Sequence, residues 1–138
     1  MAEDRSEKVA RLKMISPQFV VPDVKIAAEY YRDVLGFKIL DYFMEPPVYA
    51  IVRRDAVEIH FGKSDHGQGP ARNQERRAGG LDAYIWVTDV DELHAELASR
   101  GAKIVEGPIK TVYKCYEIVV EDQFGFRLTF GMDISEKG

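Results

Sequence analysis

The sequence Val21-Pro22-Asp23-Val24 introduces a helical stretch that ends near residue 36, and Val87-Thr88-Asp89-Val90 introduces a second one that ends near residue 101. Similar runs follow the two stretches: Gly36-Phe37-Lys38-Ile39-Leu40 in the first half and Gly101-Ala102-Lys103-Ile104-Val105 in the second. A shared order of elements, repeated at about half the chain length, indicates two copies of one supersecondary unit.

The residues at the ends of the two stretches predict where each helix starts and stops. Asp23 and Asp89 can accept the free amide hydrogens of a first helical turn, while Gly36 and Gly101 suit the left-handed backbone that ends a helix. Helices are therefore expected at about 24–35 and about 90–100. Their apolar residues recur at helical spacing, and they are Val24, Ala27, Ala28, Tyr31 and Leu35 in the first helix and Val90, Leu93 and Leu97 in the second.

Strand-like segments surround the helices, and the last strand of each half ends in Phe-Gly, at Phe61-Gly62 and Phe130-Gly131. The order of elements predicts an α+β fold of two tandem βαβββ modules, 14–62 and 81–131, with the helices on the outer face of mixed sheets. The expected strands span about 14–21, 37–44, 48–54 and 56–62 in the first module and about 81–88, 103–110, 112–120 and 126–131 in the second.

Three segments lie outside the predicted modules. Residues 63–80 contain four glycines and no periodicity, so they are expected to be a linker between the modules or a loop over a pocket. Residues 1–13 are an N-terminal extension, either a short helix with Val9 and Leu12 on one side or a mobile tail. Residues 132–138 form a short C-terminal tail.

Composition narrows the classes of protein to which the chain can belong. A length of 138 residues, 46% of them hydrophobic, predicts one folded domain. The net charge of −4 argues against a nucleic-acid partner, and no apolar run approaches the length of a membrane span. The charged N-terminus lacks the apolar region of a signal peptide, and the single cysteine, Cys115, excludes an internal disulfide. A cytoplasmic location is expected.

Alternation along four of the strands predicts one apolar and one mixed face. The apolar face of the first strand would carry Ile15, Pro17, Phe19 and Val21 and would pack under a helix. The mixed faces of the first, fourth, fifth and eighth strands carry the candidate site residues Ser16, Gln18, Glu58, His60, Asp82, Tyr84, Trp86, Arg127 and Thr129. The repeat pairs Ser16 with Asp82, Gln18 with Tyr84, Glu58 with Arg127, and His60 with Thr129.

The mixed face has three possible roles: a solvated sheet surface, a ligand pocket, or a subunit interface. Tyr84 and Trp86 favour a pocket or an interface, because large aromatic side chains are enriched at such sites.

The stretch from Asp23-Val24 into Tyr30-Tyr31-Arg32-Asp33-Val34-Leu35-Gly36-Phe37 resembles the opening helix of the vicinal oxygen chelate superfamily. That superfamily includes glyoxalase I, extradiol dioxygenases, fosfomycin and bleomycin resistance proteins, and methylmalonyl-CoA epimerase. Residues 54–61 and 117–122, followed by Gly125, are most similar to the bleomycin resistance branch. The resemblance covers about 14–131. It implies sheets that curl around a cavity, and a homodimer in which each cavity is often built by modules of two subunits.

The resemblance also implies where a metal would bind in metal-dependent members of the superfamily. The corresponding positions here are Ser16, His60, Asp82 and Thr129, of which only His60 and Asp82 are of a ligating type. A catalytic divalent site normally has three protein ligands and an open position. No cofactor is therefore expected, and His60 and Asp82 remain the candidates if a divalent metal does bind.

The favoured function is metal-independent binding of a small molecule. Tyr84 and Trp86 would stack on an aromatic or cationic group. Asp82 and Glu58 would meet positive charge, and Gln18 and Ser16 would supply hydrogen bonds.

Two other functions stay open. One is a divalent-metal-dependent lyase, isomerase or dioxygenase of the glyoxalase or extradiol type, with His60 and Asp82 as ligands and Glu58 as a base. The other is an oligomer or partner interface with no ligand. The nature of the ligand is not predicted by any motif.

Overall fold

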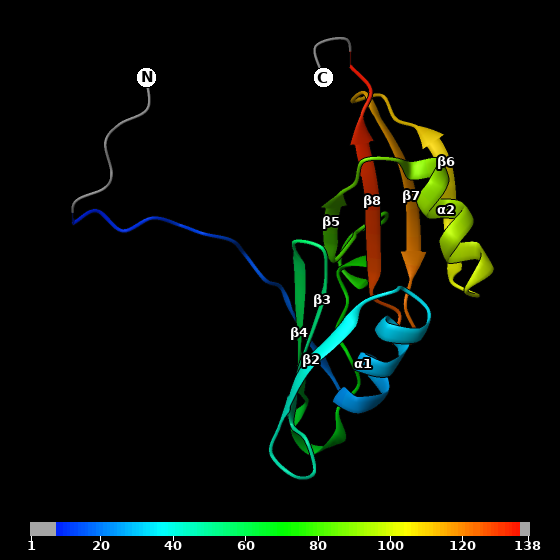
Figure 1. The fold of residues 1–138 in the computed structure, drawn as a ribbon. Helices are drawn as coiled ribbons and strands as arrows, with labels where there is room; N and C mark the ends of the chain where they lie inside the picture. Colours follow the sequence, from blue (N-terminus) through cyan, green and yellow to red (C-terminus); the bar gives the residue numbers. More distant parts are fainter. Residues whose placement is uncertain (1–7, 136–138) are drawn as a thin grey trace.

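The computed structural model describes residues 8–135, and these residues form two βαβββ modules in tandem (Figure 1). Each module has a four-stranded sheet in which the first strand runs parallel to the last, and the other neighbours are antiparallel. The predicted α+β fold with tandem modules is confirmed. Module 1 contains β1 (Gln18–Val21), α1 (Val24–Asp33), β2 (Lys38–Phe43), β3 (Tyr49–Arg54) and β4 (Val57–Lys63), and module 2 contains β5 (Ala83–Trp86), α2 (Val90–Ser99), β6 (Lys103–Lys110), β7 (Cys115–Glu121) and β8 (Arg127–Asp133).

Both helices begin at the predicted caps. The Asp23 carboxylate accepts hydrogen bonds of 3.0 Å from the amides of Lys25 and Ile26, and the Asp89 carboxylate accepts one of 3.0 Å from the amide of Glu92. Gly36 and Gly101 have φ angles of +78° and +89°, as a helix-ending glycine requires. The helices end at 33 and 99 rather than 35 and 100, because the chain starts to leave helical geometry just before each glycine.

The strands differ from the prediction mainly at their first residues. Strand β1 begins at Gln18 rather than 14, because the chain before it extends away from the modules and does not continue the ladder with β4. Ile15, expected on the core face, is consequently 89% exposed. Strand β5 is likewise shorter than predicted, and β7 begins at Cys115 rather than 112 because residues 111–114 form a turn closed by the Lys114 amide and the Thr111 carbonyl.

One hydrophobic core spans both modules. The predicted apolar positions of α1 are buried, as are Val90 and Leu97 of α2, and each helix packs on the sheet of its own module. Phe19 of β1 stacks on Phe126, just before β8, with ring centroids 4.5 Å apart. Because aromatic rings of the two modules lie in direct contact, burial in one module stabilises the other.

A buried hydrogen bond also links the modules. The Tyr31 hydroxyl of α1 donates to Oδ2 of Asp122, which lies between β7 and β8, at 2.7 Å. Oδ1 of the same carboxylate accepts 2.9 Å bonds from the amides of Phe124 and Phe126. Burial raises the pKa of Asp122 and holds the pKa of Tyr31 well above its ordinary value. Asp122 therefore shapes its own turn and anchors the helix of the other module.

The segment between the modules lies against the β7–β8 turn. It contains two short 3-10 helices, Asp65–Gly67 and Asn73–Glu75. The Arg72 guanidinium donates to the Phe124 carbonyl at 3.1 Å, and the Gln74 amide donates to the Gly125 carbonyl at 2.8 Å. These bonds hold the second part of the linker on module 2.

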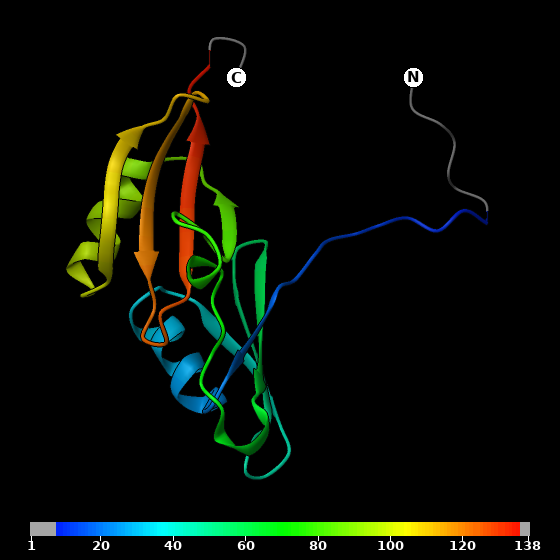
Figure 2. The same cartoon turned by 180° about the vertical axis from the view of Figure 1, so that it is seen from behind.

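The N-terminal segment before β1 extends away from both modules, as seen from two sides in Figures 1 and 2. Residues 8–17 contain no helix or strand, so the short helix considered for 1–13 does not form in the described part of that segment, while residues 1–7 lie outside the described residues. At the other end β8 continues to Asp133, and residues 136–138 are also outside the described residues.

Within residues 8–135, neither helix has the length and apolar character needed to cross a membrane.

Candidate functional site

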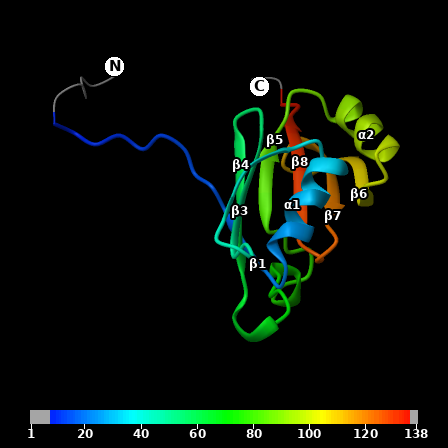
Figure 3. The ribbon, with the colours of Figure 1, turned by 60° about the horizontal axis from the view of Figure 1, so that its bottom comes forward.

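Several of the polar residues predicted from strand alternation lie on the sheet faces that point away from the helices. These faces, together called the open face, carry Gln18 and His60 on the sheet of module 1 and Tyr84 and Thr129 on the sheet of module 2. Gln18 pairs in register with His60 across β1 and β4, and Tyr84 pairs with Thr129 across β5 and β8. The internal repeat predicted this correspondence. The strands of the two modules form two separate four-stranded sheets, and Figure 3 shows those of module 1 on one side and those of module 2 on the other.

In module 1, four side chains of the open face form a hydrogen-bonded chain, the module 1 network. Gln18 Nε2 donates to the Tyr49 hydroxyl at 3.1 Å, that hydroxyl lies 2.9 Å from His60 Nδ1, and His60 Nε2 lies 2.8 Å from Glu58 Oε2. Because both ring nitrogens of His60 have a partner, the network fixes the orientation of the ring between Tyr49 and Glu58.

The residues at the implied metal positions do not fit a divalent ion. Both ring nitrogens of His60 are engaged, as described above. Both carboxylate oxygens of Asp82 accept backbone amides, Oδ1 from Asn73 and Oδ2 from Arg127, each at 2.9 Å. Within residues 8–135, no three His, Cys, Asp or Glu side chains are grouped closely enough to hold a metal ion. His60 and Asp82 therefore already have hydrogen-bond partners, and with no third ligand beside them among the described residues they do not make the three-ligand site of a catalytic divalent ion.

In module 2, the open face carries an aromatic–carboxylate cluster made of Tyr84, Trp86, Tyr113 and Glu117. The hydroxyls of Tyr84 and Tyr113 donate to the same oxygen, Glu117 Oε2, at 2.6 and 2.8 Å. Glu117 is only 6% exposed, whereas the neighbouring Trp86 is 64% exposed. The rings of Trp86 and Tyr84 have centroids 4.8 Å apart. The cluster therefore combines a buried carboxylate with accessible aromatic surface.

The electrostatics of this cluster keep both phenols neutral. Burial, followed by the hydrogen bond to Glu117, raises the pKa of Tyr84. The hydrogen bond to Glu117 is the main cause that raises the pKa of Tyr113. Both tyrosines remain donors to the carboxylate, because ionising either one would place two negative charges side by side. Aromatic faces beside a carboxylate attract cations.

The other predicted site residues lie apart from these two groups. Asp82 links the linker to β8, because its carboxylate accepts hydrogen bonds from the backbone amides of Asn73 and Arg127. Ser16 is half-buried in the segment before β1. Thr129 is 1% exposed, and Arg127 Nε is buried with no hydrogen-bond partner among the described residues. The structure thus brings Gln18, Glu58 and His60 together in one place and Tyr84 and Trp86 in another.

Three residues of the site were not predicted from the sequence: Tyr49, Tyr113 and Glu117. Tyr49 and Glu117 lie on β3 and β7, and the alternation rule would have found them had it been applied to those strands as well. Tyr113 lies in the turn before β7, where no periodicity indicates the direction of a side chain.

The sequence matches the family model Glyoxalase/Bleomycin resistance protein/Dioxygenase superfamily over residues 11–130. No curated protein matches the chain.

Several solved structures share the fold. TioX from Micromonospora sp. ML1 is 19% identical, with a TM-score of 0.69, over 88% of this chain and 98% of that chain. A superfamily member from Sphaerobacter thermophilus is 18% identical, with a TM-score of 0.69, over 89% of this chain and 98% of that chain. A glyoxalase/bleomycin resistance protein/dioxygenase from Nocardioides is 14% identical, with a TM-score of 0.66, over 94% of this chain and 89% of that chain. From the family match over residues 11–130 and the shared fold, the chain belongs to the Glyoxalase/Bleomycin resistance protein/Dioxygenase superfamily.

Proposed function

We propose that this protein binds a small organic cation with a flat aromatic part on the open face, without a metal ion. The observation that supports this proposal is the aromatic–carboxylate cluster. Trp86 is 64% exposed beside Tyr84, and the Glu117 carboxylate behind them is 6% exposed. A cation over the Trp86 ring gains about 0.5–2 kcal/mol, more when water is excluded. The buried carboxylate adds attraction for the same charge.

This assignment differs from the sequence prediction in the residue that meets the positive charge. Asp82 was expected to do so, but its two oxygens accept backbone amides. Glu117 has one oxygen, Oε2, bonded to two tyrosines. In the proposal, Glu117 replaces Asp82 as the counter-charge, while Glu58 contributes a second carboxylate from module 1.

We also propose that a second copy of the chain covers the open face, so that the ligand lies in a cavity at a homodimer interface. The open face exposes several large side chains that a partner would bury. Val20 and Trp86 are 43% and 64% exposed, and Tyr113, at the edge of the cluster, is 60% exposed. Aromatic side chains are enriched in the buried cores of such interfaces.

The ligand prediction can be tested with N-methylquinolinium as a flat cation and quinoline, at pH 8, as its neutral counterpart. Trp86 is the only tryptophan of the chain, so tryptophan fluorescence reports on the surroundings of this one residue. N-methylquinolinium is expected to quench Trp86 saturably and to bind about tenfold more tightly than quinoline, the ratio that a charge contribution of about 1.4 kcal/mol produces.

Calorimetry on two variants supplies the control for this measurement. Trp86→Ala should abolish measurable binding of N-methylquinolinium, while Trp86→Phe, which keeps an aromatic face, should retain part of it. Equal affinity of the Ala variant and the unmodified protein would exclude Trp86 as the binding surface. Equal affinity for quinoline and N-methylquinolinium would exclude recognition of charge.

Metal independence is tested by elemental analysis of protein purified without chelator or histidine tag. A substoichiometric content of divalent metal is expected, with no thermal stabilisation by added zinc, nickel, manganese or iron(II), because within residues 8–135 no third ligand lies close to His60 and Asp82. About one tightly bound ion per chain would contradict the proposal and favour the metal-dependent lyase, isomerase or dioxygenase.

A further inference from the structure

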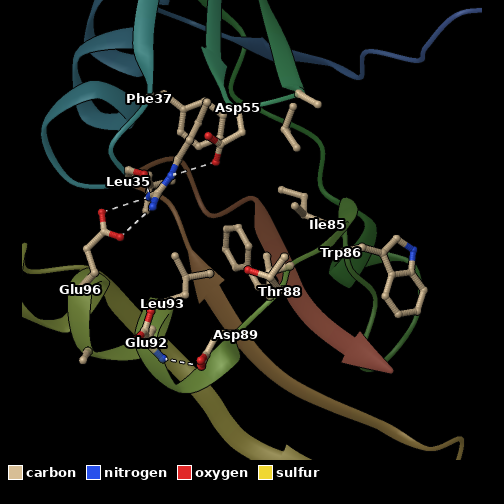
Figure 4. Close-up of a pocket in the computed structure, with 16 residues that line it drawn as sticks. Leu35, Phe37, Asp55, Ile85, Trp86, Thr88, Asp89, Glu92, Leu93 and Glu96 are labelled. Atoms are coloured by element: carbon tan, nitrogen blue, oxygen red, sulfur yellow. Dashed lines mark hydrogen bonds and ion pairs between the residues drawn. The ribbon is translucent and has the colours of Figure 1, made fainter. Parts of the chain in front are cut away.

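A cavity of about 700 Å³ lies between the two modules, and its lining includes Trp86 but not Tyr84, Tyr113 or Glu117 of the cluster. Figure 4 shows that its walls come from the β3–β4 turn and the Leu35–Phe37 region of module 1, and from the end of β5 and helix α2 of module 2. Trp86 borders the cavity, but its ring points away from the other labelled side chains. The apolar side chains of the wall are Leu35, Phe37, Val57, Ile85, Leu93 and Phe130.

The rim of this cavity is acidic. Asp55, Asp89 and Glu92 border it and are exposed. The one arginine of the wall, Arg54, donates two bonds of 2.7 and 3.1 Å to Glu96 and also lies 3.9 Å from the Asp55 carboxylate, so these two acids offset its charge (Figure 4). An occupant that fits should therefore be apolar where it enters the cavity and cationic where it crosses the rim.

The N-terminal arm, residues 8–15, has this character. It reads Lys-Val-Ala-Arg-Leu-Lys-Met-Ile, and among its side chains Leu12 is 100% exposed and Ile15 is 89% exposed. In an extended chain Leu12 and Met14 point to one side and Lys13 to the other. Exposed apolar side chains along an extended segment mark a surface that docks on another one.

We propose that the N-terminal arm of a second copy of this chain docks in the cavity between the modules. Leu12 and Met14 enter the apolar wall, and Lys13 lies at the carboxylates of the rim. The arm reaches away from its own modules (Figures 1 and 2), so the cavity that it meets belongs to another molecule. Exchange of an identical element between two chains closes a symmetric dimer, in which both cavities are filled.

The test uses two proteins that are prepared separately and then mixed. One carries Ala10→Cys in the arm and a size tag, and the other carries Ala95→Cys on the cavity side of α2, where the residue is exposed. A short bis-maleimide is expected to join the two into a covalent heterodimer, which only docking between chains can produce. Cys115 is buried, and each single variant treated alone shows whether it reacts.

Two further acceptor positions separate this proposal from its alternatives. Lys25→Cys on the exposed surface of α1 should give no heterodimer, and neither should Val20→Cys on the open face. A heterodimer through Val20, or none through Ala95, would overturn the proposal. So would an intramolecular cross-link in a chain that carries both Ala10→Cys and Ala95→Cys, because the arm would then fill its own cavity.

The charge contribution is tested in the same assay. Glu92→Lys should lower the yield of heterodimer several-fold, and Lys13→Glu on the other protein should restore it. A yield that neither variant changes would overturn the assigned role of the rim. The ligand measurement uses the open face and Trp86, so the two proposals can fail independently.

Discussion

Asp122→Ala is expected to lower the free energy of unfolding by at least about 3 kcal/mol, because each buried donor left without an acceptor costs about 1–3 kcal/mol. The substitution leaves three donors without their acceptor: the Tyr31 hydroxyl and the amides of Phe124 and Phe126. Asp122 is only 5% exposed, so water cannot replace the lost bonds without opening the core. A small domain has about 5–15 kcal/mol of stability in total, so this loss is large.

Urea unfolding followed by circular dichroism measures the effect, and Asp122→Asn is the matched control. The asparagine oxygen can still accept from Phe124 and Phe126, while its NH2 group can donate to the Tyr31 oxygen. We expect the Asn variant to lose well under half of the stability that the Ala variant loses. An Ala variant as stable as the Asn variant would show that the carboxylate does not link the modules.

The unmodified protein and Asp122→Asn should also differ in how their free energy of unfolding depends on pH. Burial raises the pKa of Asp122 in the folded state above its unfolded value, for which the ordinary Asp value is 3.8. A raised pKa means that the folded state holds the proton more tightly. The contribution of this group is therefore fully present below the unfolded pKa and is lost as pH rises through the folded pKa. The stability of the unmodified protein relative to Asp122→Asn should fall over that interval.

Gly131→Ala is expected to destroy the aromatic–carboxylate cluster and with it the binding of N-methylquinolinium. A Cβ atom at Gly131 would clash with the Tyr84 hydroxyl oxygen and with Cζ, which would lie only 2.8 Å away. The Tyr84 side chain would have to move away from this position, and its 2.6 Å hydrogen bond to the buried Glu117 would break. Overpacking of this kind costs about 1–3 kcal/mol of stability. The ligand affinity should fall at least tenfold, since Trp86 would lose the ring that it packs against.

The internal repeat supplies the control for this prediction. Gly62 is the module 1 counterpart of Gly131, and the atom that a Cβ there would meet first is Gln18 Cδ at 3.5 Å, an ordinary contact. Gly62→Ala should therefore leave both stability and affinity nearly unchanged. Calorimetry measures both variants. Unchanged affinity in Gly131→Ala would mean that Tyr84 takes no part in binding.

The fold could be predicted well because its signals are local. Caps, left-handed glycines and helical spacing depend on residues that are neighbours in the chain, and they placed α1 and α2 within two residues of their observed ends. The repeat then predicted the order of helices and strands along the chain in both modules. Alternation along β1, β4, β5 and β8 also predicted which side chains share the open face, because the period of a strand is fixed by backbone geometry.

The site itself depended on contacts between distant residues. Whether Asp82 is a free carboxylate was decided by the Asn73 and Arg127 amides, which the linker and β8 bring to it. Glu117 became the buried carboxylate of the site because Tyr113, in a turn, and Tyr84, 33 residues away, both donate to it.

The division between the two kinds of result follows from the range of the interactions. Helix ends and strand faces depend on a few successive residues, so they can be predicted from the sequence. Asp23, Gly36, Asp89 and Gly101 indicate the helix ends in this way. Hydrogen-bond partners, burial and pKa shifts depend on which segments meet, and that is settled only when both modules pack around one core. The exposure of Ile15 illustrates the difference: its alternation matched a strand, but the chain before Gln18 extends away from the sheet instead of pairing with β4.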